Sequence, residues 1–65
     1  MNEKVKASIE PDGTLYNLGW YLSWRPGEDD AILDGSFSAD ELRAIADHMD
    51  HVNSKRYLDA VAPSG

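Results

Sequence analysis

The chain has 65 residues, no cysteine, and twelve acidic against six basic residues, which gives a formal net charge of −6 at pH 7. A chain of this length forms one small domain with a thin core, and without cysteine it has neither a disulfide framework nor a thiolate metal site. Its charge disfavours direct binding to nucleic acid, and no apolar run reaches membrane-spanning length. We therefore expect a cytoplasmic protein with one domain at 1–60 and a tail at 61–65.

Two strands are predicted in the N-terminal part of the chain. Residues 4–10 alternate apolar and polar side chains, which is the period of a half-buried strand. Residues 11–13, Pro-Asp-Gly, have the composition of a turn, so a hairpin is expected to lead into a second strand at 14–24. Alternation along this second strand places five large side chains on the face that we expect to be the core: Tyr16, Leu18, Trp20, Leu22 and Trp24.

The opposite face of the second strand is expected to stay uncovered, because a single helix can cover only one face of a sheet. This face would carry Leu15, Asn17, Tyr21 and Ser23. Tyrosine is favoured at protein interfaces because it combines a large area with a polar tip. We therefore predict that Tyr21 contacts a partner on an open sheet face.

A loop, a short strand and a helix are predicted in the C-terminal part. Residues 25–30, Arg-Pro-Gly-Glu-Asp-Asp, are typical of a solvated loop, and 31–33 of a short third strand. Ser38 and Glu41 have the spacing of a capping box, which marks the start of a helix. The apolar stripe expected to pack on the sheet consists of Leu42, Ile45, Ala46, Met49 and Val52. The predicted fold class is α+β, a three-stranded antiparallel β-meander with one C-terminal α-helix packed on one face (βββα).

Acidic residues are concentrated in the second half of the domain, where residues 26–54 contain eight acids and one base, Arg43. A solvated face that keeps the protein in solution explains this charge without a partner. The alternative is that the carboxylates occupy phosphate-like positions and bind the basic surface of another protein. Besides Tyr21, the residues predicted to bind a partner are Glu28, Asp29, Asp30, Asp34, Asp47 and Asp50.

One cluster contains common metal-ligand types, the segment Asp-His-Met-Asp-His at 47–51. His48 and His51 are three residues apart and project from neighbouring positions of a helix, so they could share a metal. A stable zinc site needs further ligands that the same helix does not easily supply. We expect a solvated polar face with two titratable histidines and no cofactor, and retain His48 and His51 as weak metal candidates.

Catalysis is not expected, because the sequence has no Gly-x-Ser-x-Gly nucleophile elbow and no glycine-rich phosphate-binding loop. We predict a small acidic protein-interaction module, in its sharpest form a DNA mimic that blocks the groove of a basic nucleic-acid-binding protein. In size, charge and lack of a catalytic motif the chain resembles the small acidic proteins that phages and mobile elements use as inhibitors of host machinery, including some anti-CRISPR proteins. The alternatives are a structural or regulatory homodimer, formed through Ile32, Leu58 or Val61, and a small metal- or ligand-binding domain centred on His48 and His51.

Overall fold

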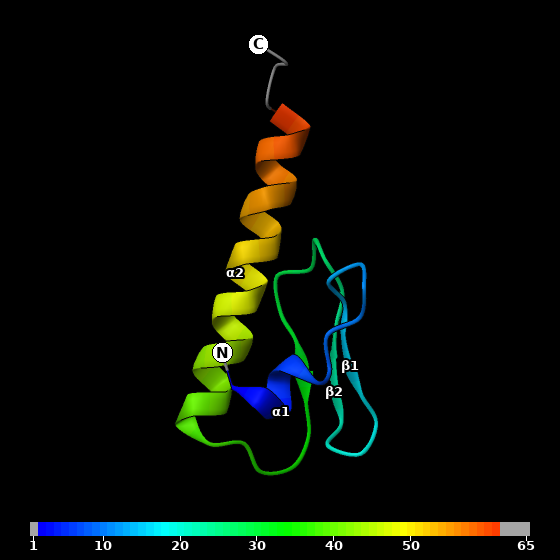
Figure 1. Cartoon of the computed structure of the whole chain (residues 1–65), viewed down its shortest axis with the longest axis vertical. Coiled ribbons are helices and arrows are strands. Elements are labelled where there is room, and N and C mark those ends of the chain that lie inside the picture. The colour runs from blue at the N-terminus through cyan, green and yellow to red at the C-terminus, as the bar shows by residue number, and fades with distance from the viewer. Residues whose placement is uncertain (1, 62–65) are drawn as a thin grey trace.

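One sheet and one long helix make the two layers of the structure (Figure 1). The computed structural model describes residues 2–61, with side chains from 2 to 55. In chain order the elements are α1 (Glu3–Lys6), β1 (Leu15–Asn17), β2 (Leu22–Trp24), β3 (Ile32–Leu33) and α2 (Ala39–Val61). Within these residues, no helix combines the length and the apolarity needed to cross a membrane.

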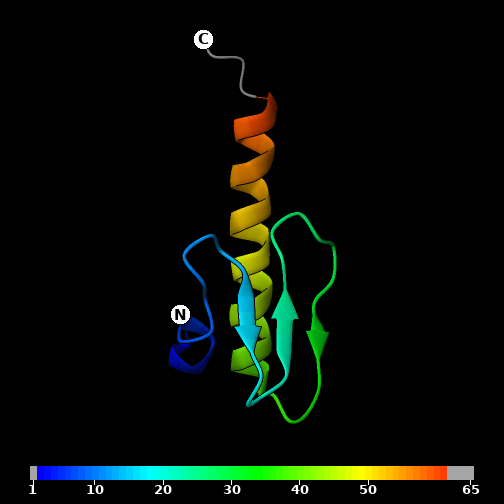
Figure 2. The same ribbon diagram turned by 90° about the vertical axis from the view of Figure 1, so that its right-hand side faces the viewer.

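The predicted fold class is confirmed. The strands pair antiparallel in the order β1-β2-β3, and α2 follows them in the sequence. Figure 2 shows α2 lying across one face of the sheet, while α1 lies beside β1 at the sheet margin. In Figure 1 the C-terminal part of α2 extends beyond the sheet. The end of the predicted tail, 62–65, lies outside the described residues.

The predicted strand at 4–10 is wrong, because this segment begins with helix α1. Asn2 caps the helix, since its side-chain oxygen accepts hydrogen bonds from the N–H groups of Lys4 at 2.9 Å and Val5 at 3.3 Å. Val5 is fully buried. Of the predicted strand, only Ile9 makes a β-bridge, to Leu15. Two of the apolar residues that suggested a strand thus have other roles: Val5 is buried on a capped helical turn, and Ile9 forms a single β-bridge.

The predicted single strand at 14–24 is also wrong, because it folds into β1, a turn and β2. Each cross-strand pair joins an odd-numbered residue to an even-numbered one, as in Leu15 with Trp24 and Tyr16 with Ser23. Odd positions of β1 therefore share a face with even positions of β2. Leu15 is fully buried, whereas Tyr16 is 51% and Leu18 69% exposed. The core face was predicted correctly for β2 and inverted for β1.

The start of α2 follows the predicted capping box. Ser38 N–H donates to Glu41 Oε1 at 2.6 Å, and Glu41 N–H donates to Ser38 Oγ at 3.1 Å. The buried stripe is rotated from the predicted one, because Leu42 is 45% exposed and the buried positions include His48. The core draws on α1, β1, β2 and α2 and consists of Val5, Leu15, Leu22, Trp24, Ala44 and Ile45.

The inverted face of β1 leads to a stability prediction. Leu15→Ala should lower the free energy of unfolding by about 2–5 kcal/mol, because it removes a fully buried side chain from the core. Tyr16→Ala should lower it by less than about 1 kcal/mol, because half of that side chain already faces solvent. Urea unfolding followed by tryptophan fluorescence measures both. If Tyr16→Ala were the more costly change, the observed register of β1 would be contradicted.

Candidate binding surface

The face of the sheet that α2 leaves open carries a row of three side chains in register. Tyr16 pairs with Ser23 and Ser23 pairs with Ile32, so the three residues point to the same side of the sheet. In Figure 2, α2 lies behind the sheet. Leu15, Leu22 and Trp24, which alternate with this row along the strands, are buried, so the row lies on the face opposite α2. Tyr16 and Ile32 are 51% and 59% exposed. The short Ser23 side chain lies between these two large side chains in the row.

A groove of about 850 Å³ continues from this row along the open face. The groove is lined by side chains that include those of Glu10, Asp12, Thr14, Tyr16, Ser23 and Arg25. Asp12 accepts a hydrogen bond from the Thr14 N–H at 2.9 Å, and this bond, followed by that from the Thr14 side chain, holds the pKa of Asp12 below its usual 3.8. Asp12 is therefore ionised at neutral pH. The groove combines an aromatic wall with charged side chains of both signs.

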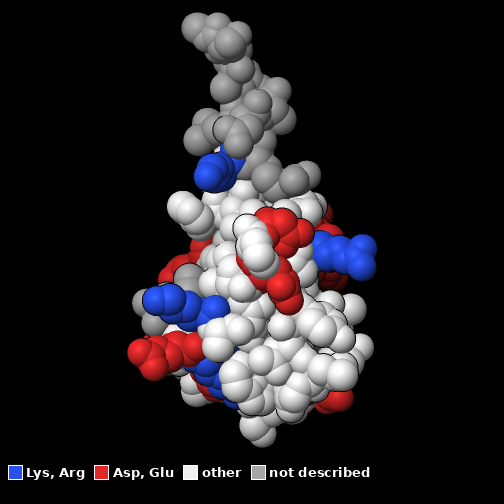
Figure 3. Space-filling model, turned by 45° about the vertical axis from the view of Figure 1, so that its right-hand side comes forward, with Lys and Arg blue, Asp and Glu red and all other residues white. Residues whose placement is uncertain are grey.

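The six acids predicted to bind a partner are all exposed and lie in two regions. Glu28, Asp29 and Asp30 occupy the loop between β2 and β3, and Asp34 follows β3 directly. Asp47 and Asp50 lie on α2. On the face shown in Figure 3, acidic and basic groups are interspersed around a wide uncharged area. The structure thus brings four of the six acids to the neighbourhood of β3.

Tyr21 lies in the turn that joins β1 to β2, whereas it was predicted on the open face of one long strand. Its φ of 49° is in the left-handed region, and its N–H donates to the Leu18 carbonyl at 3.3 Å. It is half exposed and lines a second hollow of about 340 Å³ together with Trp20 and Asp34. Tyr21 is therefore accessible to a partner from the end of the sheet rather than from the open face.

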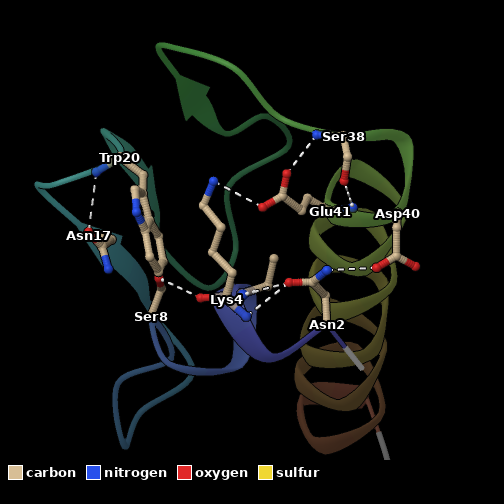
Figure 4. A network of polar contacts seen from close by, with 9 residues as sticks. Asn2, Lys4, Ser8, Asn17, Trp20, Ser38, Asp40 and Glu41 are labelled. Carbon is tan, nitrogen blue, oxygen red and sulfur yellow. Dashed lines mark hydrogen bonds and ion pairs between the residues drawn. The ribbon is translucent and has the colours of Figure 1, made fainter.

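A network centred on Lys4 ties α1 to the β1–β2 turn and to α2 (Figure 4). Lys4 Nζ lies 2.9 Å from Glu41 Oε2 and 4.8 Å from the ring centroids of both Trp20 and Phe37. The hydrogen bond from Ser38 N–H, followed by that from Lys4, holds the pKa of Glu41 below its usual 4.5. Glu41 is thus engaged inside the structure.

Asp40 is also engaged, because its Oδ2 accepts a hydrogen bond of 2.6 Å from Asn2 Nδ2. Figure 4 shows this bond beside the Lys4 network. The two acids of the first turn of α2, Asp40 and Glu41, therefore hold the N-terminal segment in place. They are less available to a partner than the acids around β3.

His48 is a core residue, which corrects the predicted solvated face. It is 7% exposed, and its Nε2 lies 2.7 Å from the Gly13 carbonyl oxygen. Because a carbonyl oxygen only accepts, Nε2 carries the proton in this contact. The imidazole also meets the indole of Trp24 edge to face, with 5.7 Å between the ring centroids. His51 is exposed, and no group of three or more His, Cys, Asp or Glu within the described part of the chain could hold a metal ion.

The open-face row was missed because Tyr16 was placed in the core. The sequence does contain a signal for the turn that inverts β1: Asn17 and Gly19 are turn formers in the middle of the apolar run. In the structure Asn17 Oδ1 accepts a hydrogen bond of 3.3 Å from the Trp20 N–H, as expected of an Asn that stabilises a turn.

The residues left available for an interaction are the open-face row, the groove beside it and the acids around β3. No protein-family model, curated protein or solved structure matches the chain. The functional interpretation therefore depends on these residues and their geometry.

The role of His48 can be tested against that of His51 on the same helix. His48→Ala should lower the free energy of unfolding by about 2–4 kcal/mol, because it removes the ring packed on Trp24 and leaves the Gly13 carbonyl without its partner. His51→Ala, the matched control on the exposed side of α2, should change it by no more than about 0.5 kcal/mol. Chemical denaturation of both variants measures the difference. Equal effects of the two substitutions would contradict the burial of His48 and support the predicted solvated face.

Proposed function

We propose that the protein is a small, non-catalytic interaction module that binds another protein through the open face of its sheet. The observation that carries this proposal is the row formed by Tyr16, Ser23 and Ile32, which lies in register on the face opposite α2. An exposed row with an aromatic and an aliphatic side chain on either side of a short residue is a surface on which partner side chains can pack.

The exposed apolar groups lie mostly on the sheet and its turn, and Tyr16 and Ile32 among them lie on the open face. Among the described residues, six large hydrophobic side chains are exposed, and five of them belong to the sheet or its β1–β2 turn. These five are Tyr16, Leu18, Tyr21, Ile32 and Leu33. The sixth, Leu42, lies on α2. Single exposed hydrophobic residues need no explanation, but a group of them on one part of a small domain favours a contact there.

The charge around the sheet indicates the class of partner. From residue 26 to residue 42 the chain has six acids and no lysine or arginine. Asp40 and Glu41 are held by Asn2 and Lys4, and the other four acids are exposed around β3. Carboxylates at the margin of an apolar surface attract a partner with a basic margin and repel an acidic one. The favoured class is a basic protein such as one that binds nucleic acid, whose groove the module would block.

A homodimer is the second candidate, and it makes a different prediction about charge. Ile32 is the described residue of the predicted homodimer contact, while the side chains of Leu58 and Val61 lie outside the described ones. Two copies meeting through this part of the sheet would bring their exposed acids together, which costs free energy at low salt. The charge therefore favours a different, basic protein as the partner.

The proposal is tested with the double variant Tyr16→Ala/Ile32→Ala. Wild-type protein immobilised at low salt should capture a basic protein from a lysate of the native host, and the purified pair should be measured by isothermal titration calorimetry. The double variant should weaken this affinity about tenfold or more, because it removes both large side chains of the row. Both residues are exposed, so the variant should keep its fold.

Leu42→Ala is the matched control, because Leu42 is a similarly exposed hydrophobic residue on α2. It should leave the affinity unchanged. An affinity that is equal for wild type and the double variant would refute the open face as the binding surface. If light scattering shows a wild-type dimer that the double variant converts to a monomer, the homodimer is the correct alternative.

A further inference from the structure

The sheet has one unpaired edge within the described part of the chain, and this edge is β3. The strand order β1-β2-β3 makes β1 and β3 the outer strands. The outer side of β1 is occupied, because Tyr16 N–H donates to the Ser8 carbonyl at 2.8 Å and Ile9 bridges to Leu15. In Figure 2, β3 lies at the margin of the sheet away from α1. An unpaired edge is a template for a further strand.

The hydrogen-bond pattern shows which backbone groups β3 offers. Asp34 N–H donates to the Tyr21 carbonyl at 3.0 Å, so this pair belongs to the hydrogen-bonded positions of the antiparallel ladder. Bonded and non-bonded positions alternate, and Leu33 faces Leu22 at a non-bonded position. The N–H and C=O of Leu33 therefore point away from β2, toward the open edge. Leu33 can exchange two hydrogen bonds with an incoming strand without loss of any existing one.

Acids bracket this edge on both sides. Asp29 and Asp30 precede β3, Asp34 follows it, and all three are exposed. Charged residues beside an edge strand oppose pairing with strands of like charge. A second copy of β3 would bring the same three acids against these, whereas an extended segment rich in lysine or arginine would be attracted. The charge thus favours a basic segment over a second copy of β3 at this edge.

We propose that β3 accepts an extended basic segment of the partner protein as a fourth strand of the sheet. The backbone of this segment bonds to Leu33, and its basic side chains lie near Asp30 and Asp34. Ile32 is the last residue of the open-face row, so the added strand prolongs that row with a residue of the partner. The inference rests on the proposed function and specifies the form in which the partner is bound.

The probe is a fluorescein-labelled peptide of alternating lysine and valine, titrated with the full chain at low salt and followed by fluorescence anisotropy. A second peptide with the same sequence is N-methylated along its backbone, which keeps its charge and removes its hydrogen-bond donors. The dissociation constant of the methylated peptide should be about tenfold or more higher than that of the unmethylated one. The dissociation constant of the unmethylated peptide should also rise with salt concentration. Asp30→Asn/Asp34→Asn should weaken binding of the unmethylated peptide about fivefold or more.

Leu33→Pro tests the same edge from the side of the protein. Proline removes the Leu33 N–H, which points outward, and leaves the β2–β3 ladder bonds intact. This variant should weaken peptide binding about tenfold, whereas the control Leu33→Ala, which keeps the N–H, should weaken it no more than about threefold. Thermal unfolding shows whether Leu33→Pro is folded, and the methylated peptide tests the wild-type chain even if it is not.

Two results would overturn the inference. One is equal affinity for the methylated and unmethylated peptides, which means attraction by charge without strand pairing. The other is no binding of the unmethylated peptide at low salt. Either result leaves the proposed function to be judged by the Tyr16→Ala/Ile32→Ala variant and its natural partner, so the two failures can be told apart.

Discussion

The indole of Trp24 is fully buried and has one polar group that needs a hydrogen-bond partner. Its Nε1–H donates to the Glu28 carbonyl at 3.0 Å, which closes the loop after β2 over the indole. The same carbonyl accepts a second hydrogen bond, of 3.2 Å, from Asn53 on α2. The indole also packs edge to face with His48, which in turn holds the Gly13 carbonyl of the turn before β1. One buried tryptophan thus connects β2, the β2–β3 loop, the turn before β1 and α2, and the position of the sheet on the helix depends on it.

A core arranged around one side chain on one face of the sheet leaves the other face without cover. Residues 2–61 contain no second helix layer to provide that cover, because α1 is four residues long and lies beside β1. The open-face row and the edge of β3 are direct results of this arrangement. The acids of the first turn of α2 hold the N-terminal segment, whereas Asp29, Asp30 and Asp34 beside β3 are exposed. The packing contacts of the sheet thus lie on one face, and its exposed apolar row lies on the other.

Local signals in the sequence predict the parts of the fold that depend on neighbouring residues. The capping box at Ser38 and Glu41 locates the start of α2, and the short third strand is found where the pattern places it. The face of β1 was not predictable by alternation, because it depends on a turn that shifts the register of Leu15 against Trp24. The burial of His48 depends on a carbonyl 35 residues away, at Gly13. Four of the predicted partner-binding acids do lie around β3, but the row of Tyr16 and Ile32 emerged only with the tertiary structure.

Amide hydrogen exchange by NMR tests most directly whether the sheet has the observed register and an open β3 edge. The amides of Tyr16 and Asp34 donate to the carbonyls of Ser8 and Tyr21, so both should exchange slowly. The amide of Leu33 points toward the open edge and should exchange much faster than that of Asp34 beside it. A Leu33 amide as protected as that of Asp34 in the free protein would contradict the account, because the edge would then already be occupied.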